Sequence, residues 1–138
     1  MLVLEKSVLV HASEKLAYTC WLHVERFPDF MEEAESVQRL DKMRLRWRVN
    51  CEGQSLEYET EVTVEIPHHR IAWRIHSGLK GSGAVVFDER EPGLTLVTLG
   101  MILDPSRCAV DEQKMQALLE AHMMRDLQRF KAMVETVA

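Results

Sequence analysis

Residues 43–66, MRLRWRVNCEGQSLEYETEVTVEI, decide the fold of this chain, because apolar and charged side chains alternate along both halves of the stretch. Arginines separate the apolar residues before Gly53, and glutamates separate them after it. A period of two is typical of a β-strand with one buried face and one face in water. The stretch therefore predicts a β-hairpin with an apolar inner face and a charged outer face.

The turn of this hairpin is expected at Gly53-Gln54. A two-residue loop there places Trp47 opposite Thr60 and Arg48 opposite Glu59. A slip of one residue would turn the whole apolar set into water, so the sequence specifies the two faces firmly.

The length and charge of the chain restrict the classes of function. Its 138 residues are enough for a single domain over 1–138 with one hydrophobic core. The formal net charge is −5, and acidic and basic residues are mixed along the sequence instead of gathering in a basic stripe. We therefore do not expect nucleic acid as a partner.

The cysteines and the apolar runs bear on location. Cys20, Cys51 and Cys108 are far apart and lack the CxxC spacing of zinc or redox sites. This favours a reduced, cytoplasmic protein, and we expect no metal and no cofactor.

The N-terminal apolar run stops at Glu5-Lys6, and no run approaches the roughly 18 residues of a membrane-spanning helix. We expect neither export by a visible signal nor stable membrane insertion, and a monomer and a dimer are both open.

Short elements are predicted before the hairpin. A strand over 3–11 leads to a short helix over 14–23, with the preceding serine as its N-cap. Pro28 breaks that helix and suits the first turn of a second short helix over 28–35. A strand over 36–40 follows.

The alternation returns after Pro67 in a strand over 70–76, and the glycines at 78, 81 and 83 predict a loop. Residues 85 and 87 pair best with 99 and 97 if residues 91–93 form a three-residue loop whose glycine is left-handed. The chain therefore contains six or seven antiparallel strands.

The period changes to that of a helix over 111–137, where apolar residues are spaced by three or four: Met115, Leu119, Met123, Leu127, Phe130 and Val134. The element order predicts an α+β helix-grip architecture, in which a curved antiparallel sheet wraps this long C-terminal helix and two short helices follow the first strand.

Three segments carry a resemblance to a known family: ASEKLAYTCWLHVERFPDFM over 12–31, ESVQRL over 35–40 and RIAW over 70–73. They resemble the polyketide cyclase/dehydrase and lipid-transport family of the START-like (SRPBCC) superfamily, and the predicted element order matches over nearly the whole chain. Two positions depart from its pattern. His23 stands where such sequences often have an acidic residue, and Glu32 stands where a proline is common.

The resemblance implies a cavity between the sheet and the C-terminal helix that holds a hydrophobic or aromatic small molecule, such as a lipid, a quinone or a polyketide-like compound. The faces of the predicted elements give its expected lining: Trp47, Tyr58, Thr60, Trp73, Phe87, Val97, Leu99, Met101, Met115, Leu119, His122 and Met123. The alternative is that these residues are ordinary hydrophobic core.

Two other functions stay open. A polyketide-type aromatase/cyclase or dehydratase without a metal would use His122 as general acid or base, oriented by Asp126 one turn further on, with Tyr58 or Thr60 as a second proton-handling group. A solvated surface pair on the helix is the ordinary explanation for the same two residues. A protein-binding module would instead act through its surface and expose the loop residues Phe27, Phe30 and Met31.

Overall fold

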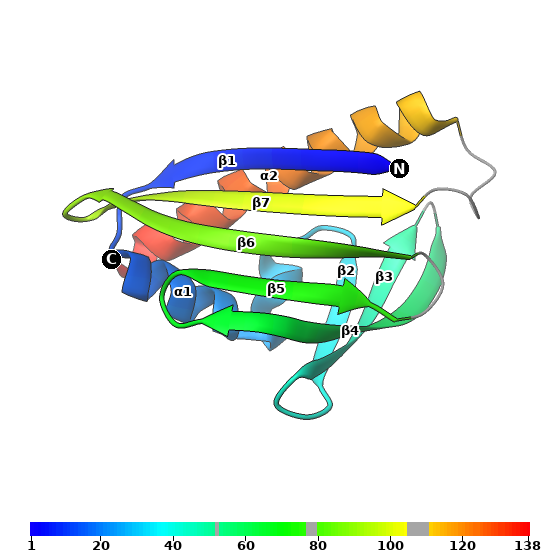
Figure 1. The fold of residues 1–138 in the computed structure, drawn as a ribbon, viewed down its shortest axis with the longest axis horizontal. Helices are drawn as coiled ribbons and strands as arrows, with labels where there is room; N and C mark the ends of the chain where they lie inside the picture. The colour runs from blue at the N-terminus through cyan, green and yellow to red at the C-terminus, as the bar shows by residue number, and fades with distance from the viewer. Residues whose placement is uncertain (52, 77–79, 105–110) are drawn as a thin grey trace.

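The computed structural model, which describes residues 1–51, 53–76, 80–104 and 111–138, contains a seven-stranded antiparallel sheet in the order β1-β7-β6-β5-β4-β3-β2 (Figure 1). Its strands are β1 (Leu2–Val10), β2 (Ala34–Arg39), β3 (Arg44–Cys51), β4 (Gln54–Ile66), β5 (Arg70–Ile75), β6 (Lys80–Glu91) and β7 (Leu94–Asp104).

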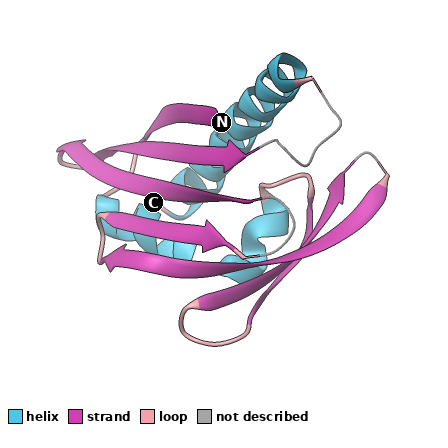
Figure 2. Ribbon diagram, turned by 45° about the vertical axis from the view of Figure 1, so that its right-hand side comes forward, coloured by secondary structure: helices cyan, strands magenta, loops and turns pink. Residues whose placement is uncertain are grey.

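The helices α1 (Glu14–Leu22), η1 (Val24–Asp29) and α2 (Glu112–Val137) lie on one face of this sheet, and the sheet curves around them (Figures 1 and 2). The helix-grip prediction is confirmed. Among the described residues, no helix combines the length and the apolar character needed to cross a membrane.

Strands β3 and β4 form the predicted hairpin with the predicted faces, but the predicted register was wrong. Trp47 lies opposite Tyr58 rather than Thr60, because Cys51 pairs with Gln54. The strands therefore join one residue earlier than expected, which shifts the register by two residues. A shift of two keeps every side chain on its own face, so the alternation alone did not distinguish the two registers.

The second short helix was predicted at the wrong place. It is the 3-10 helix η1, which begins at Val24, before Pro28, and ends well before residue 35. Val24 and Phe27 of this helix are both buried, so the chain turns early to bring them onto the core. The strand β2 then begins at Ala34, two residues before the predicted start.

The glycines after β5 were predicted as a loop, but Gly81 and Gly83 lie within strand β6, and Gly78 falls outside the described residues. A Cβ atom on Gly83 would stand only 2.6 Å from Cζ2 of Trp73. Glycine is needed here because the indole ring of the neighbouring strand lies directly on the β6 backbone.

The hairpin of β6 and β7 has the predicted pairing, since Val85 and Phe87 lie opposite their expected partners. Gly93 adopts the predicted left-handed conformation with φ of +78°. Glu91 pairs with Leu94, so the connecting loop has two residues instead of three. A register irregularity between residues 89 and 91 absorbs the difference.

The helix boundaries follow local capping chemistry. The hydroxyl of Ser13 accepts a hydrogen bond from the backbone N–H of Leu16 and caps α1, as predicted. Asp111 caps α2 in the same way through the backbone N–H of Gln113. The buried residues of α2 lie from its middle to its C-terminal end: Met123, Leu127, Phe130 and Val134.

Candidate functional site

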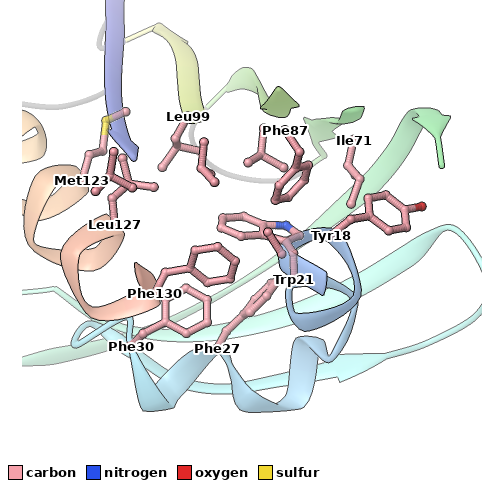
Figure 3. Packing of buried hydrophobic residues seen from close by; sticks show 14 of the residues in the cluster. Tyr18, Trp21, Phe27, Phe30, Ile71, Phe87, Leu99, Met123, Leu127 and Phe130 are labelled. Carbon is pink, nitrogen blue, oxygen red and sulfur yellow. The ribbon is translucent and has the colours of Figure 1, made fainter. Parts of the chain in front are cut away.

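The interface between the sheet and the helices has two different ends. We call one the packed end and define it by Trp21, Phe27, Phe30, Phe87 and Phe130, all of which are buried. Their rings meet edge-on or tilted at centroid distances of 5.3 to 6.4 Å (Figure 3). Such aromatic contacts add to the stability that burial itself provides.

The other end, which we call the open end, is formed by inward-facing residues that are only half-buried: Trp47, Tyr58, Trp73, Met101, Met115 and Leu119. In the sheet, Trp73 and Met101 flank Gly83 from its two sides. Met115 and Leu119 come from the N-terminal half of α2. Apolar side chains from both walls are therefore incompletely covered at this end.

The predicted lining residues divide between the two ends. Thr60, Phe87, Val97, Leu99 and Met123 are buried within the core. The residues that define the open end, together with His122, keep partial exposure.

The polar groups of the open end are partly satisfied by one another. The indole N–H of Trp47 donates a hydrogen bond of 3.0 Å to Oγ1 of Thr60, so the protein itself supplies the partner of this half-buried N–H group. Trp47 also stacks on Tyr58 with a centroid distance of 5.8 Å and an interplanar angle of 7°. This pair forms a flat aromatic wall on β3 and β4.

A charged cluster links the middle of α2 to the segment before β2. Nη2 of Arg125 lies 2.5 Å from Oε2 of Glu33, and Nη1 lies 3.0 Å from Oε2 of Glu32. Arg125 also contacts Asp126 at 3.2 Å, and Nε2 of His122 lies 3.4 Å from Oε1 of Glu33. The carboxylate that faces His122 is therefore that of Glu33, and Asp126, the partner considered under the enzyme alternative, contacts Arg125.

Three groups of the cluster, Glu33, Arg125 and Asp126, have shifted pKa values. Burial pushes the pKa of Glu33 upward, but hydrogen bonding from Arg125 and the nearby positive charge outweigh burial and hold the pKa below its usual range. Burial raises the pKa of Asp126 to about 6, against the opposing effect of Arg125. The hydrogen bond to Glu33 raises the pKa of Arg125. Glu33 is thus an ionised partner for His122, and Asp126 titrates closer to neutral pH.

Sequence reasoning missed the role of the Glu32-Glu33 pair. Glu32 was noted only as a departure from the family pattern, yet it contacts both Arg125 and Arg129. The sequence contained a signal for this pair. Arg125 and Arg129 are four residues apart on the helix, where like charges repel each other, so acidic side chains from another segment are favourable neighbours.

The loop prediction for a protein-binding module is not met, because Phe27 and Phe30 are buried and Met31 packs against the core. A turn at His68-His69 joins β4 to β5, with φ of +67° at His68. Nδ1 of His69 lies 3.1 Å from the carbonyl oxygen of Phe87. No group of three or more His, Cys, Asp or Glu side chains in the described part of the chain could hold a metal ion.

A small pocket of about 150 Å³ lies away from the open end, between the C-terminal parts of α1 and α2. Its lining includes Cys20, His23 and Met133. Pockets for drug-sized ligands usually have about 300 to 1,000 Å³, so this one is too small for the expected ligand. Burial also raises the pKa of the Cys20 thiol, which makes it less reactive.

Comparison with known proteins identifies the family. The chain belongs to the family described as polyketide cyclase / dehydrase and lipid transport, whose model matches residues 10–133. An uncharacterized 17.2 kDa protein in the melC2-rnhH intergenic region of Streptomyces lincolnensis is 28% identical over 132 residues, covering 95% of this chain and 88% of the relative.

Solved structures share the fold. A START superfamily protein from Mycobacterium smegmatis superposes with a TM-score of 0.85 at 18% identity, covering 99% of both chains. The Zhui aromatase/cyclase from Streptomyces sp. R1128 superposes with a TM-score of 0.79 at 18% identity, covering 97% of this chain and 93% of that one. The resemblance inferred from the sequence is confirmed at the level of family and fold.

Proposed function

We propose that this protein binds a hydrophobic or aromatic small molecule, such as a lipid, a quinone or a polyketide-like compound, between the open end of the sheet and the N-terminal half of α2. The observation that carries the proposal is the partial exposure of inward-facing apolar side chains there, while those of the packed end are fully covered. Ligand sites are typically lined by such apolar groups with a few polar ones among them. The family description, which includes lipid transport, supports the same function.

The direct test is ligand binding with a matched pair of variants. Native mass spectrometry and thermal-shift measurements with polycyclic aromatics, quinones and fatty acids should identify a ligand. Leu119→Trp places a larger side chain in the open end. It should weaken binding of that ligand by about tenfold or more, because the added ring occupies space that the ligand needs.

Leu118→Trp makes the same change at the neighbouring position, whose side chain is 48% exposed, and should leave the affinity unchanged. An absence of any binding, or equal losses in both variants, would contradict the proposal.

The pairing of His122 with Glu33 favours one second candidate, an aromatase/cyclase or dehydratase that uses His122 as general acid or base. A carboxylate beside an imidazole can orient the ring for proton transfer. If this protein is such an enzyme, His122→Gln should lower turnover by about 10² or more while ligand affinity is largely kept. For a carrier, the same variant changes affinity alone, and we expect that result.

A further inference from the structure

The guanidinium group of Arg125, one turn from His122, is already occupied by carboxylates. It contacts Glu32, Glu33 and Asp126. A guanidinium group that is shared among several carboxylates has few donors left for another anion. Arg129 lies a further turn from His122 along α2, 3.7 Å from Glu32. Arg125 therefore offers no ready counter-ion to an acidic ligand.

The charge of the cluster opposes an acidic ligand directly. Three carboxylates face two guanidinium groups, and the lowered pKa of Glu33 keeps that group ionised at neutral pH. A carboxylate placed beside this cluster would meet like charges and lose solvation without gaining a partner. Such unfavourable placement is a common source of specificity.

The same cluster suits a neutral ligand that carries a hydroxyl group. Nε2 of His122 lies 3.4 Å from Oε1 of Glu33, so one side of the ring already faces a carboxylate. A hydroxyl group can both donate and accept a hydrogen bond, so it can pair with an imidazole nitrogen whether or not that nitrogen carries a proton. A carboxylate can only accept, and it would also meet the charge of Glu33.

The charged cluster lies next to the apolar residues of the open end. Leu119 precedes His122 by one helical turn and therefore lies on the same side of α2. The carbonyl oxygen of Glu33 accepts a hydrogen bond of 2.7 Å from the backbone N–H of Asn50, three residues after Trp47 on β3. His122 and Glu33 thus bridge the helix wall and the sheet wall at the border of the open end.

We propose that the His122–Glu33–Arg125 cluster makes the site selective for a neutral apolar ligand with a hydroxyl group, an alcohol or a phenol, over the corresponding carboxylate. This inference rests on the proposed ligand-binding function and adds the chemical class of the ligand.

The test compares three probes with one ring system, namely naphthalene, 2-naphthol and 2-naphthoate, by equilibrium titration at pH 7.5. We expect 2-naphthol to bind wild type about tenfold more tightly than 2-naphthoate, since like-charge placement costs at least this much at a partly buried site. Glu33→Gln removes one carboxylate and frees part of Arg125. It should therefore strengthen the binding of 2-naphthoate and reduce the difference in affinity between 2-naphthol and 2-naphthoate.

Glu57→Gln is the matched control, because it removes the same charge from the exposed outer face of β4, where Glu57 pairs with Arg48. The control should keep the wild-type selectivity. If 2-naphthoate binds wild type as tightly as 2-naphthol, or if Glu57→Gln acts like Glu33→Gln, the selectivity inference is wrong while the binding function stands. If none of the three probes binds while a quinone or a fatty acid does, the inference is wrong and the binding function stands. If no ligand of any of these classes binds, the proposed function fails together with the inference.

Discussion

The packed end and the open end use the same sheet and the same helix, yet their side chains are covered to different degrees. At the packed end, α1 and η1 lie beside α2 on the same face of the sheet, and Trp21 from α1 reaches both Phe87 of the sheet and Phe130 of α2. The N-terminal half of α2 lacks this cover, and Met115 and Leu119 stay half-buried. An apolar stripe on a helix therefore indicates which face turns inward, while neighbouring elements decide how far each part is buried.

The largest expected effect comes from the packed end. Phe130→Ala should lower the free energy of unfolding by about 3 to 5 kcal/mol, because Phe130 is 0% exposed and its loss leaves a cavity. Leu119→Ala at the open end should cost less than about 1 kcal/mol, because the side chain is already partly in water. Urea unfolding measures both values, and equal losses would remove the distinction between the two ends.

A smaller effect is expected at the open end where the indole ring of Trp73 lies against Gly83. Gly83→Ala should destabilise the protein by about 1 to 3 kcal/mol, because its Cβ atom would stand 2.6 Å from the indole ring. The fluorescence of Trp73 should change as the ring is displaced.

Gly100→Ala is the matched control for that change. The nearest heavy atom to its Cβ would be the carbonyl oxygen of Leu4 at 3.8 Å, which is ordinary van der Waals contact. This variant should be neutral or should stabilise the protein by roughly 0.4 to 1 kcal/mol through the unfolded chain. If Gly83→Ala is equally harmless, the close approach of Trp73 does not shape the open end.

The charged cluster predicts a pH dependence with a defined sign. Asp126 has a pKa of about 6 in the folded protein against an ordinary 3.8, so the folded state binds the proton more tightly than the unfolded chain does. Protonation of this group therefore stabilises the fold at low pH, and that contribution is lost as pH rises through about 6.

Relative to Asp126→Asn, the free energy of unfolding of wild type should fall by about 1 to 3 kcal/mol between pH 4 and pH 7, since each pKa unit corresponds to about 1.4 kcal/mol. The side chain is 16% exposed, so solvent screening reduces the effect little. Asp29→Asn, at an exposed ion pair with Arg26, should show no such trend. If the free energy of unfolding of wild type relative to Asp126→Asn stays constant or rises with pH, burial does not raise the pKa of Asp126.

The smallest effect is expected on the outer face of the hairpin, away from both ends. Arg48 lies 3.4 Å from Glu57, and both side chains are exposed. A double-mutant cycle with Arg48→Ala and Glu57→Ala should give a coupling of about 0.2 to 1 kcal/mol that weakens with added salt. A larger, salt-independent coupling would show that this face is covered.

The element order and the faces of the strands could be predicted from the sequence, because local periodicity fixes which side chains turn inward. The family was inferred separately, from the resemblance carried by residues 12–31, 35–40 and 70–73. The cap at Ser13 and the left-handed conformation of Gly93 were also predicted correctly, because each depends on only a few neighbouring residues. The turn between β3 and β4 was misplaced by one residue, because both registers preserve the same faces.

The sequence by itself determined a sheet with one apolar face and a long helix to cover it. Only the tertiary structure decided that Glu33, from a segment about 90 residues away in the chain, faces His122, and that Gly83 makes room for Trp73. Periodicity reports the direction of a side chain relative to its own backbone. Distances between elements depend instead on how all side chains pack at once, and no short stretch of sequence contains that information.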